Sequence, residues 1–269
     1  MSSRIVTAPA WEKLIRDSWL DSVETVFAHT KGDVVAAKTS SEVRRVELAN
    51  GDRRETVFIK KYWVSDPSQL FSALFRDTLA GRSRVKREFE NMQQLREWKL
   101  DAPEPMAYGE QRVCGFLTRS FLISRAVASP IALDVFIRNH LQQLQRREFI
   151  ERLADATRRM HERLFFHGDL YWRNIIVSSG LLDHFYLLDA HKGRVYGANE
   201  SNARRAEDLA ALDAPAPKYF RRTERLWFFL RYVGSSKLTA ADKELLRLTL
   251  RLAEPIRARQ IHRVERASA

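Results

Sequence analysis

The spacing of apolar and polar residues predicts two regions of different structure. Residues 23–63 and 104–123 hold short β-rich runs separated by turn residues, a pattern typical of antiparallel strands. Apolar residues at helical spacing predict helices over residues 11–19, 83–98, 131–139, 147–164, 203–212, 223–232 and 240–259. We therefore expect a bilobal α+β fold, with a small antiparallel sheet in residues 1–123 and a mainly helical lobe in residues 124–269.

A polar stretch interrupts the helical region, and it reads His167-Gly168-Asp169-Leu170-Tyr171-Trp172-Arg173-Asn174. Two β-rich runs follow around the turn-like residues 178–180, which predicts a hairpin that brings Asn174 close to Asp189. In kinases, the catalytic base is an Asp, and the metal ligands that follow it are an Asn and then an Asp at the end of the next strand. This stretch has the same order. We predict Asp169 as the base, and Asn174 and Asp189 as ligands of Mg²⁺, which prefers oxygen.

Such a site requires a lysine on an upstream strand and a glutamate that holds it. The run Val57-Phe58-Ile59-Lys60 matches the kinase strand pattern VAIK and follows the turn at residues 50–52. We predict that Lys60 contacts the α and β phosphates of ATP. Lys61 should point to the opposite face, because side chains alternate along a strand.

The helix over residues 83–98 supplies the candidate glutamate. Its apolar stripe contains Val85, Met92 and Leu95, and Glu88 lies near the centre of that stripe, whereas Glu90 points away. A carboxylate on an apolar face is costly without a partner. We therefore predict that Glu88 pairs with Lys60; the alternative is a solvated helix charge.

ATP is expected between the two lobes. The turn Thr39-Ser40-Ser41, between strands at residues 33–38 and 43–48, lacks the glycines usual in a nucleotide loop. Backbone amides and hydroxyls of Ser40 and Ser41 can still bind phosphate. We place the link between the lobes at residues 124–126 and expect backbone groups from Ser124 onward to meet adenine.

The sequence resembles the bacterial lipopolysaccharide kinases of the WaaP and Kdo kinase type, which are protein-kinase-like enzymes. The resemblance implies ATP- and Mg²⁺-dependent transfer of the γ-phosphate to a sugar hydroxyl of the lipopolysaccharide inner core, on a heptose or Kdo, either lipid-linked or free. It covers most of the chain, through the strand at residues 57–63, the helix at 87–91, the segment at 102–109, the loop at 167–174, the strand end at 188–191 and the helix at 205–212.

The sequence departs from that of protein kinases at positions that bear on the class of acceptor molecule. Gly168 replaces the arginine that receives an activation-loop phosphate, and Asp189-Ala190-His191 replaces Asp-Phe-Gly. The stretch from Asp189 to Asp208 is short for a peptide-docking segment, so a sugar or small molecule is favoured over a polypeptide. A phosphotransferase of the aminoglycoside or choline type shares the loop and is the main alternative. A protein kinase and a pseudokinase are further ones.

Composition points to an enzyme that handles acidic material. The chain has 269 residues, of which 45% are hydrophobic, and a single cysteine. Residues 1–10 do not read as a secretion signal, and no apolar run is long enough to span a membrane. We therefore expect a cytoplasmic protein, which also fits the single cysteine. The net charge is +12. Basic residues gather at residues 76–87 and in the helix after residue 240, which suits peripheral binding to the anionic inner leaflet. Nucleic acid is a less favoured partner, because no nucleic-acid motif is present.

Overall fold

The computed structural model describes residues 1–64, 82–142, 144–178 and 181–268, and of residues 181–183 and 260–268 it describes the backbone alone. The chain divides into two compact units. The first unit comprises Met1–Trp98 with Pro103–Val127, and the second comprises Lys99–Ala102 with Ala128–Ala269. An antiparallel sheet dominates the first unit and helices dominate the second, which confirms the predicted α+β class.

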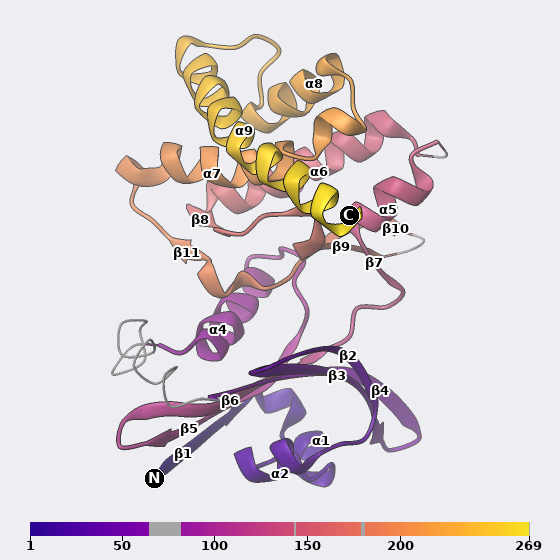
Figure 1. Ribbon diagram of the computed structural model, residues 1–269, viewed down its shortest axis with the longest axis vertical. Coiled ribbons are helices and arrows are strands. Elements are labelled where there is room, and N and C mark those ends of the chain that lie inside the picture. The colour runs from indigo at the N-terminus through magenta and orange to yellow at the C-terminus, as the bar shows by residue number, and fades with distance from the viewer. Residues whose placement is uncertain (65–81, 143, 179–180, 269) are drawn as a thin grey trace. The chain divides into compact units, whose positions relative to one another are not determined.

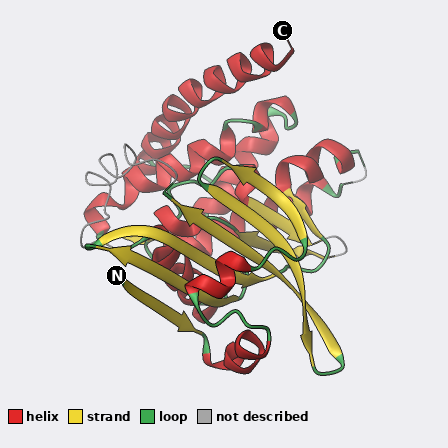
Figure 2. Ribbon diagram, turned by 60° about the horizontal axis from the view of Figure 1, so that its bottom comes forward, coloured by secondary structure: helices red, strands yellow, loops and turns green. Residues whose placement is uncertain are grey.

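The first unit is built on a six-stranded sheet with the order β1-β5-β6-β4-β3-β2, in which all neighbours are antiparallel. Figure 2 shows its twist. The strands are β1 (Ser2–Thr7), β2 (Asp33–Lys38), β3 (Ser41–Asn50), β4 (Arg53–Trp63), β5 (Pro105–Val113) and β6 (Phe116–Arg125). The helices are η1 (Pro9–Trp11), α1 (Glu12–Asp17), α2 (Val23–Ala28) and α4 (Arg84–Glu97).

Helices cover both faces of this sheet (Figure 1). On one face, Ile15 of α1 and Val23 of α2 pack with Val57 and Ile59 of β4 in a buried cluster. On the other face, Phe89 of α4 and its neighbours pack against β5 and β6. Side chains of β4 therefore alternate between two buried environments, and this alternation decides where each lysine of the strand points.

Two N-terminal predictions were wrong. Residues 23–28 form helix α2 rather than a strand, because Ser22 Oγ accepts the Thr25 N–H and the reciprocal bond completes a capping box. The predicted helix over residues 11–19 ends earlier, at Asp17, and Trp19 takes a left-handed backbone with φ 57°. Strand β1 was not predicted, because its pairing with the distant β5 leaves no local signal.

The second unit is mainly helical, with α5 (Leu133–His140), α6 (Arg146–Glu162), α7 (Ser201–Asp213), α8 (Arg222–Val233) and α9 (Ala240–Ser268). Short 3₁₀ turns are η2 (Trp172–Asn174), η3 (Ala190–Lys192), η4 (Ala198–Glu200) and η5 (Ala216–Lys218). One small sheet has the order β10-β9-β7, from β7 (Pro130–Ala132), β9 (Ile175–Ser178) and β10 (Leu181–Leu187), and a second pairs β8 (Phe165–Phe166) with β11 (Arg194–Val195).

The hairpin predicted after the polar stretch is present. Strands β9 and β10 are antiparallel, and the Leu188 N–H donates to Asn174 O at 2.8 Å. This bond joins the end of β10 to the end of the polar stretch. It therefore holds Asp189, the next residue, close to Asn174.

No helix in the described part of the chain is long and apolar enough to cross a membrane.

Candidate active site

Lys60 and Glu88 meet inside the first unit. Lys60 lies on the α4-facing side of β4, and its Nζ is 2.7 Å from Glu88 Oε1. The Glu88 side chain is 0% exposed and lies on the same helix face as Val85 and Met92. Because a buried carboxylate needs a cation or donor, Lys60 stabilises Glu88 in this position. The predicted contact is confirmed.

The neighbouring residues Lys61 and Glu90 have different surroundings. Lys61 faces α2, where Nζ donates to His29 O at 2.6 Å and lies 3.5 Å from Glu42 Oε1. Burial lowers the Lys61 pKa, and the Glu42 charge opposes that shift. Glu90 lies on the outer face of α4, within 4 Å of Arg82 and Lys86. Lys61 therefore points to the opposite face from Lys60, as predicted.

The turn between β2 and β3 is tighter than expected. Lys38 pairs directly with Ser41, so only Thr39 and Ser40 connect the strands. Ser41 is the first residue of β3 and pairs with Tyr62, and Ser40 O accepts the Trp63 N–H at 3.0 Å. Ser40 is thus a turn residue, whereas Ser41 belongs to the sheet because β3 begins earlier than the predicted residue 43.

Ser124 lies inside β6 and not in a link between the units. It is 4% exposed and pairs with Phe58 on one side and Pro105 on the other. The backbone N–H groups of the next two residues also form hydrogen bonds within the first unit. Arg125 N–H donates to Glu104 O, and Ala126 N–H donates to Thr56 O. The change of unit falls after Val127 rather than after residue 123, since strand pairing continues through residue 125.

The polar stretch of the second unit places Asp169 beside Asn174. Asn174 Nδ2 donates to the backbone O of Asp169 at 2.8 Å and to its Oδ2 at 2.9 Å. Asp189 follows β10 with a left-handed backbone, φ 55° and ψ 35°. Asp is one of the non-glycine residues that tolerate this region. Hydrogen bonds of the loop and hairpin therefore gather the three predicted residues in one place.

These side chains fit a magnesium ion. Because Asn174 turns its Nδ2 toward Asp169, the amide oxygen Oδ1 points away from Asp169, and we propose it as a ligand together with the Asp189 carboxylate. In the described ranges, no group of three or more His, Cys, Asp or Glu side chains could hold a metal by itself. A donor set of one carboxylate and one amide suits Mg²⁺, which commonly completes its shell with water and substrate phosphates.

Two cations lie against the Asp169 carboxylate. Lys192 Nζ is 3.0 Å from Oδ1, and Arg173 Nη2 is 3.6 Å from Oδ2. Both side chains are more than half exposed, and the Arg173 guanidinium also lies over the Tyr171 ring at 4.4 Å. Sequence patterns did not single out either residue. A signal for Lys192 was its place shortly after Asp189, the predicted metal ligand.

The loop rests on Asp208 of α7, which sequence reasoning used only as a landmark. Its carboxylate is buried and accepts the N–H of His167 at 2.7 Å and the N–H of Gly168 at 2.9 Å. His161 Nε2 lies 3.3 Å from the same carboxylate, and His161 Nδ1 lies 2.8 Å from the Tyr232 hydroxyl. An acidic residue beside the apolar run at residues 209–212 was the signal for this buried role.

His167 is held neutral under the loop. Its Nε2 lies 2.9 Å from Leu188 O, a carbonyl, so Nε2 carries the proton and donates. The ring is fully buried, and burial lowers the His167 pKa, while the charge of Asp208 partly opposes that shift. His167 thus ties the loop to the strand end that precedes Asp189.

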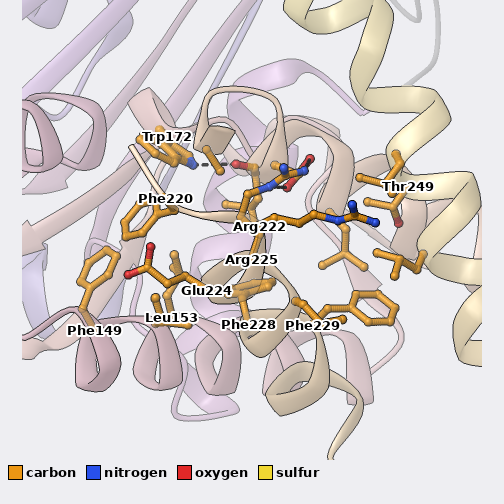
Figure 3. A pocket seen from close by; sticks show the side chains of 18 of the residues that line it. Phe149, Leu153, Trp172, Phe220, Arg222, Glu224, Arg225, Phe228, Phe229 and Thr249 are labelled. Atoms are coloured by element: carbon orange, nitrogen blue, oxygen red, sulfur yellow. Dashed lines mark hydrogen bonds and ion pairs between the residues drawn. The ribbon is translucent and has the colours of Figure 1, made fainter. Parts of the chain in front are cut away.

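An apolar cavity of about 260 Å³ lies deeper in the second unit. Figure 3 shows Trp172 at one side of it, opposite Phe149 and Leu153 of α6, with Phe228 and Phe229 of α8 also lining the space. Trp172 Nε1 donates to Leu212 O at 2.8 Å. The loop that carries Asp169 is therefore anchored to the wall of this cavity.

The sequence matches the lipopolysaccharide kinase (Kdo/WaaP) family over residues 26–246. No curated protein matches it. The fold resembles the solved structure of WaaP in complex with acyl carrier protein, with 21% sequence identity, a TM-score of 0.66, and coverage of 94% of this chain and 98% of that chain. The sequence match includes Lys60, Glu88, Asp169, Asn174 and Asp189. We conclude that the chain belongs to the lipopolysaccharide kinase (Kdo/WaaP) family and is a kinase.

Proposed function

We propose that this protein transfers the γ-phosphate of ATP to a sugar hydroxyl of the lipopolysaccharide inner core, on a heptose or Kdo. The observation that carries the proposal is the cluster of Asp169, Asn174 and Asp189, which hydrogen bonds of the loop and hairpin hold together. Membership of a lipopolysaccharide kinase family supports the acceptor class.

Each residue has a separate task in this proposal. Lys60, oriented by Glu88, binds the α and β phosphates, and the amide of Ser40 adds a donor to the phosphates. Asp169 accepts the proton of the acceptor hydroxyl. At the same time the hydroxyl oxygen forms a bond to the γ-phosphorus, and the bond between the γ-phosphorus and the ADP oxygen breaks. Asn174 and Asp189 would hold Mg²⁺, which neutralises phosphate charge when bound.

The proposal is tested by mixing the purified protein with labelled ATP and, separately, core lipopolysaccharide, free sugars and aminoglycosides. We expect label on the core lipopolysaccharide alone. Efficient phosphorylation of a free aminoglycoside would favour the small-molecule phosphotransferase instead. Binding of ATP without transfer to any of these acceptors would favour a pseudokinase.

Two variants separate the tasks of the carboxylates. Asp169→Asn should lower turnover about 10²- to 10⁴-fold, the usual contribution of a general base, and should retain Mg²⁺-dependent ATP binding. Asp189→Asn should lose that binding. Calorimetric titration with ATP in the presence and absence of Mg²⁺ distinguishes them, and turnover by Asp169→Asn at the parent rate would refute the assignment.

A further inference from the structure

A hollow of about 290 Å³ adjoins the catalytic loop within the second unit. Its volume is near the lower end of small-molecule sites, which suits about one sugar residue rather than a whole glycolipid. The loop, α7 and α9 contribute its walls, chiefly through Asp169, Tyr171, Glu207, Pro255, Ile256 and Arg259. The catalytic base therefore forms part of a site large enough for the acceptor.

The walls combine the groups that recognise a sugar. Asp169 and Glu207 offer carboxylate oxygens that accept hydrogen bonds from hydroxyl groups. Pro255 and Ile256 offer apolar surface for the C–H faces of a sugar ring. Arg259 adds donors on the α9 side, where its Nε lies 3.1 Å from Pro255 O. The hollow can thus orient a ring while one hydroxyl reaches Asp169.

Two cations adjoin this hollow through Asp169, although neither is among the residues that line it. Lys192 and Arg173 both contact the Asp169 carboxylate, so two cations neighbour one anion. Their side chains are 55% and 57% exposed, whereas Asp169 is 16% exposed, which puts the cations on the solvent side of the base. An acceptor whose hydroxyl reaches Asp169 therefore lies near these two cations. A negative group beside its hydroxyl is therefore favoured.

Gly168 makes room for Lys192. Its φ is +70°, and a Cβ added there would lie 3.2 Å from the Lys192 Cβ. The glycine therefore lets the stem of Lys192 lie against the loop and its ammonium reach Asp169. The residue that distinguishes this loop from that of protein kinases is thus linked to a lysine beside the base.

We propose that the hollow binds one sugar residue whose phosphorylated hydroxyl neighbours an anionic group, either a carboxylate or a phosphate. Lys192 and Arg173 bind the anionic group, and the walls from α7 and α9 hold the ring. The inference rests on the proposed function and names the acceptor chemistry of that same site. An ammonium has three donors, so Lys192 can contact the anion and Asp169 together and keeps its proton while Asp169 takes the proton of the hydroxyl.

The test uses the deacylated inner-core oligosaccharide as acceptor. Lys192→Met should raise KM for this acceptor about 10- to 100-fold, the usual loss when a charge-assisted hydrogen bond is removed, with KM for ATP within about twofold of the parent. Lys192→Arg should retain most of the affinity. Arg259→Gln and Ile256→Trp, on the α9 wall, should also raise KM for the acceptor.

Matched controls come from the same helix. Lys243 and Arg251 are exposed on α9 and outside the hollow, so Lys243→Met and Arg251→Gln should change neither KM. Two further acceptors identify the anion: the oligosaccharide after carboxyl reduction and the oligosaccharide after removal of phosphate. One of these treatments should raise the KM of the parent for the acceptor and abolish the difference between the parent and Lys192→Met. The group that this treatment removes is the anionic group that Lys192 binds.

The outcomes separate the two proposals. If the parent phosphorylates neither core lipopolysaccharide nor the untreated oligosaccharide, the proposed function and this inference both fail. If the parent is active but the Lys192 and Arg259 variants match the controls, only the inference fails. A rise in KM for ATP with an unchanged KM for the acceptor would place Lys192 on the nucleotide and overturn the acceptor site.

Discussion

Adjacent lysines on β4 show how one residue of register separates two environments. Lys60 faces Glu88, and Lys61 faces His29 O and Glu42. Glu88 is 0% exposed, so removal of its cation leaves a buried carboxylate uncompensated. Glu42 differs, because Arg44 also contacts it at 2.7 Å.

We therefore expect Lys60→Met to lose turnover almost completely and to lower the free energy of unfolding by about 3–5 kcal/mol. Lys61→Met should keep turnover and lose less stability. Steady-state kinetics and urea denaturation measure the two effects. Glu88→Gln combined with Lys60→Met should recover stability but not turnover, because the uncompensated charge is gone while the cation proposed to bind phosphate is still absent. Equal kinetics for Lys60→Met and Lys61→Met would contradict the assignment.

His167 makes stability depend on pH. Its folded pKa is lowered by burial, so below the ordinary value of 6.5 the unfolded chain binds more protons than the folded chain. The stabilisation is therefore complete above about pH 6.5 and is lost as pH falls toward the folded pKa. His29 contributes in the same direction, because burial lowers its pKa too.

We expect the melting temperature of the parent to decrease as the pH is lowered from 7.5 to 5.5. His167→Gln should melt at a lower temperature than the parent near neutral pH but show a shallower decline. His29→Gln is the comparison variant, because His29 is only partly buried and its pKa is lowered in the same direction. Thermal melts at several pH values check this, and parallel curves for parent and His167→Gln would exclude His167 as the cause.

At the scale of elements, Asp208 in the middle of α7 supports the loop at residues 167–174, while Asp213 at the C-terminal end of the same helix binds Arg225 of α8 and Arg257 of α9. The two aspartates therefore make different kinds of contact from one helix. Asp208 fixes the backbone of residues 167–168, and Asp213 joins helices.

Asp208→Asn should lower turnover by at least about tenfold and destabilise the fold by about 1–3 kcal/mol, because one amide oxygen cannot replace both carboxylate oxygens at two buried N–H groups. Asp213→Asn should lower stability and leave turnover close to the parent. Kinetics and denaturation of both variants provide the comparison. A selective loss of turnover in Asp213→Asn would reverse these roles.

Local patterns predicted the elements that hold the candidate site residues better than they predicted the elements around them. The Asn174–Asp189 hairpin and the Glu88 register were predictable because turn residues and apolar spacing are local. Strand β1 and the strand position of Ser124 depend on pairing with distant strands, which no local pattern encodes. Asp208 and Lys192 contact the loop only when the fold brings them to it, so the weak signals that their sequence positions offer could not identify these contacts.

At the scale of the whole molecule, the net charge of +12 and the exposed arginines bear on the membrane. Of the first basic segment, Arg76 lies outside the described residues. Arg82 is 72% exposed, whereas Arg84 lies over the Tyr62 ring and Lys86 is near Glu90. On α9, Arg247 and Arg251 are exposed, and the side chains of Arg263 and Arg266 lie outside the described set.

We propose peripheral binding to an anionic surface, and the prediction follows from this distribution. Vesicles with anionic lipid should bind the protein at low salt, neutral vesicles should bind it poorly, and binding should weaken as salt rises, because exposed charges are screened within about 10 Å at 0.1 M. Replacement of Arg82, Arg247 and Arg251 by Gln should weaken binding while ATP affinity stays unchanged, since all three are exposed and none is among the residues proposed to bind ATP. Vesicle sedimentation across a salt series measures this. Equal binding to neutral and anionic vesicles would mean that charge does not drive membrane binding.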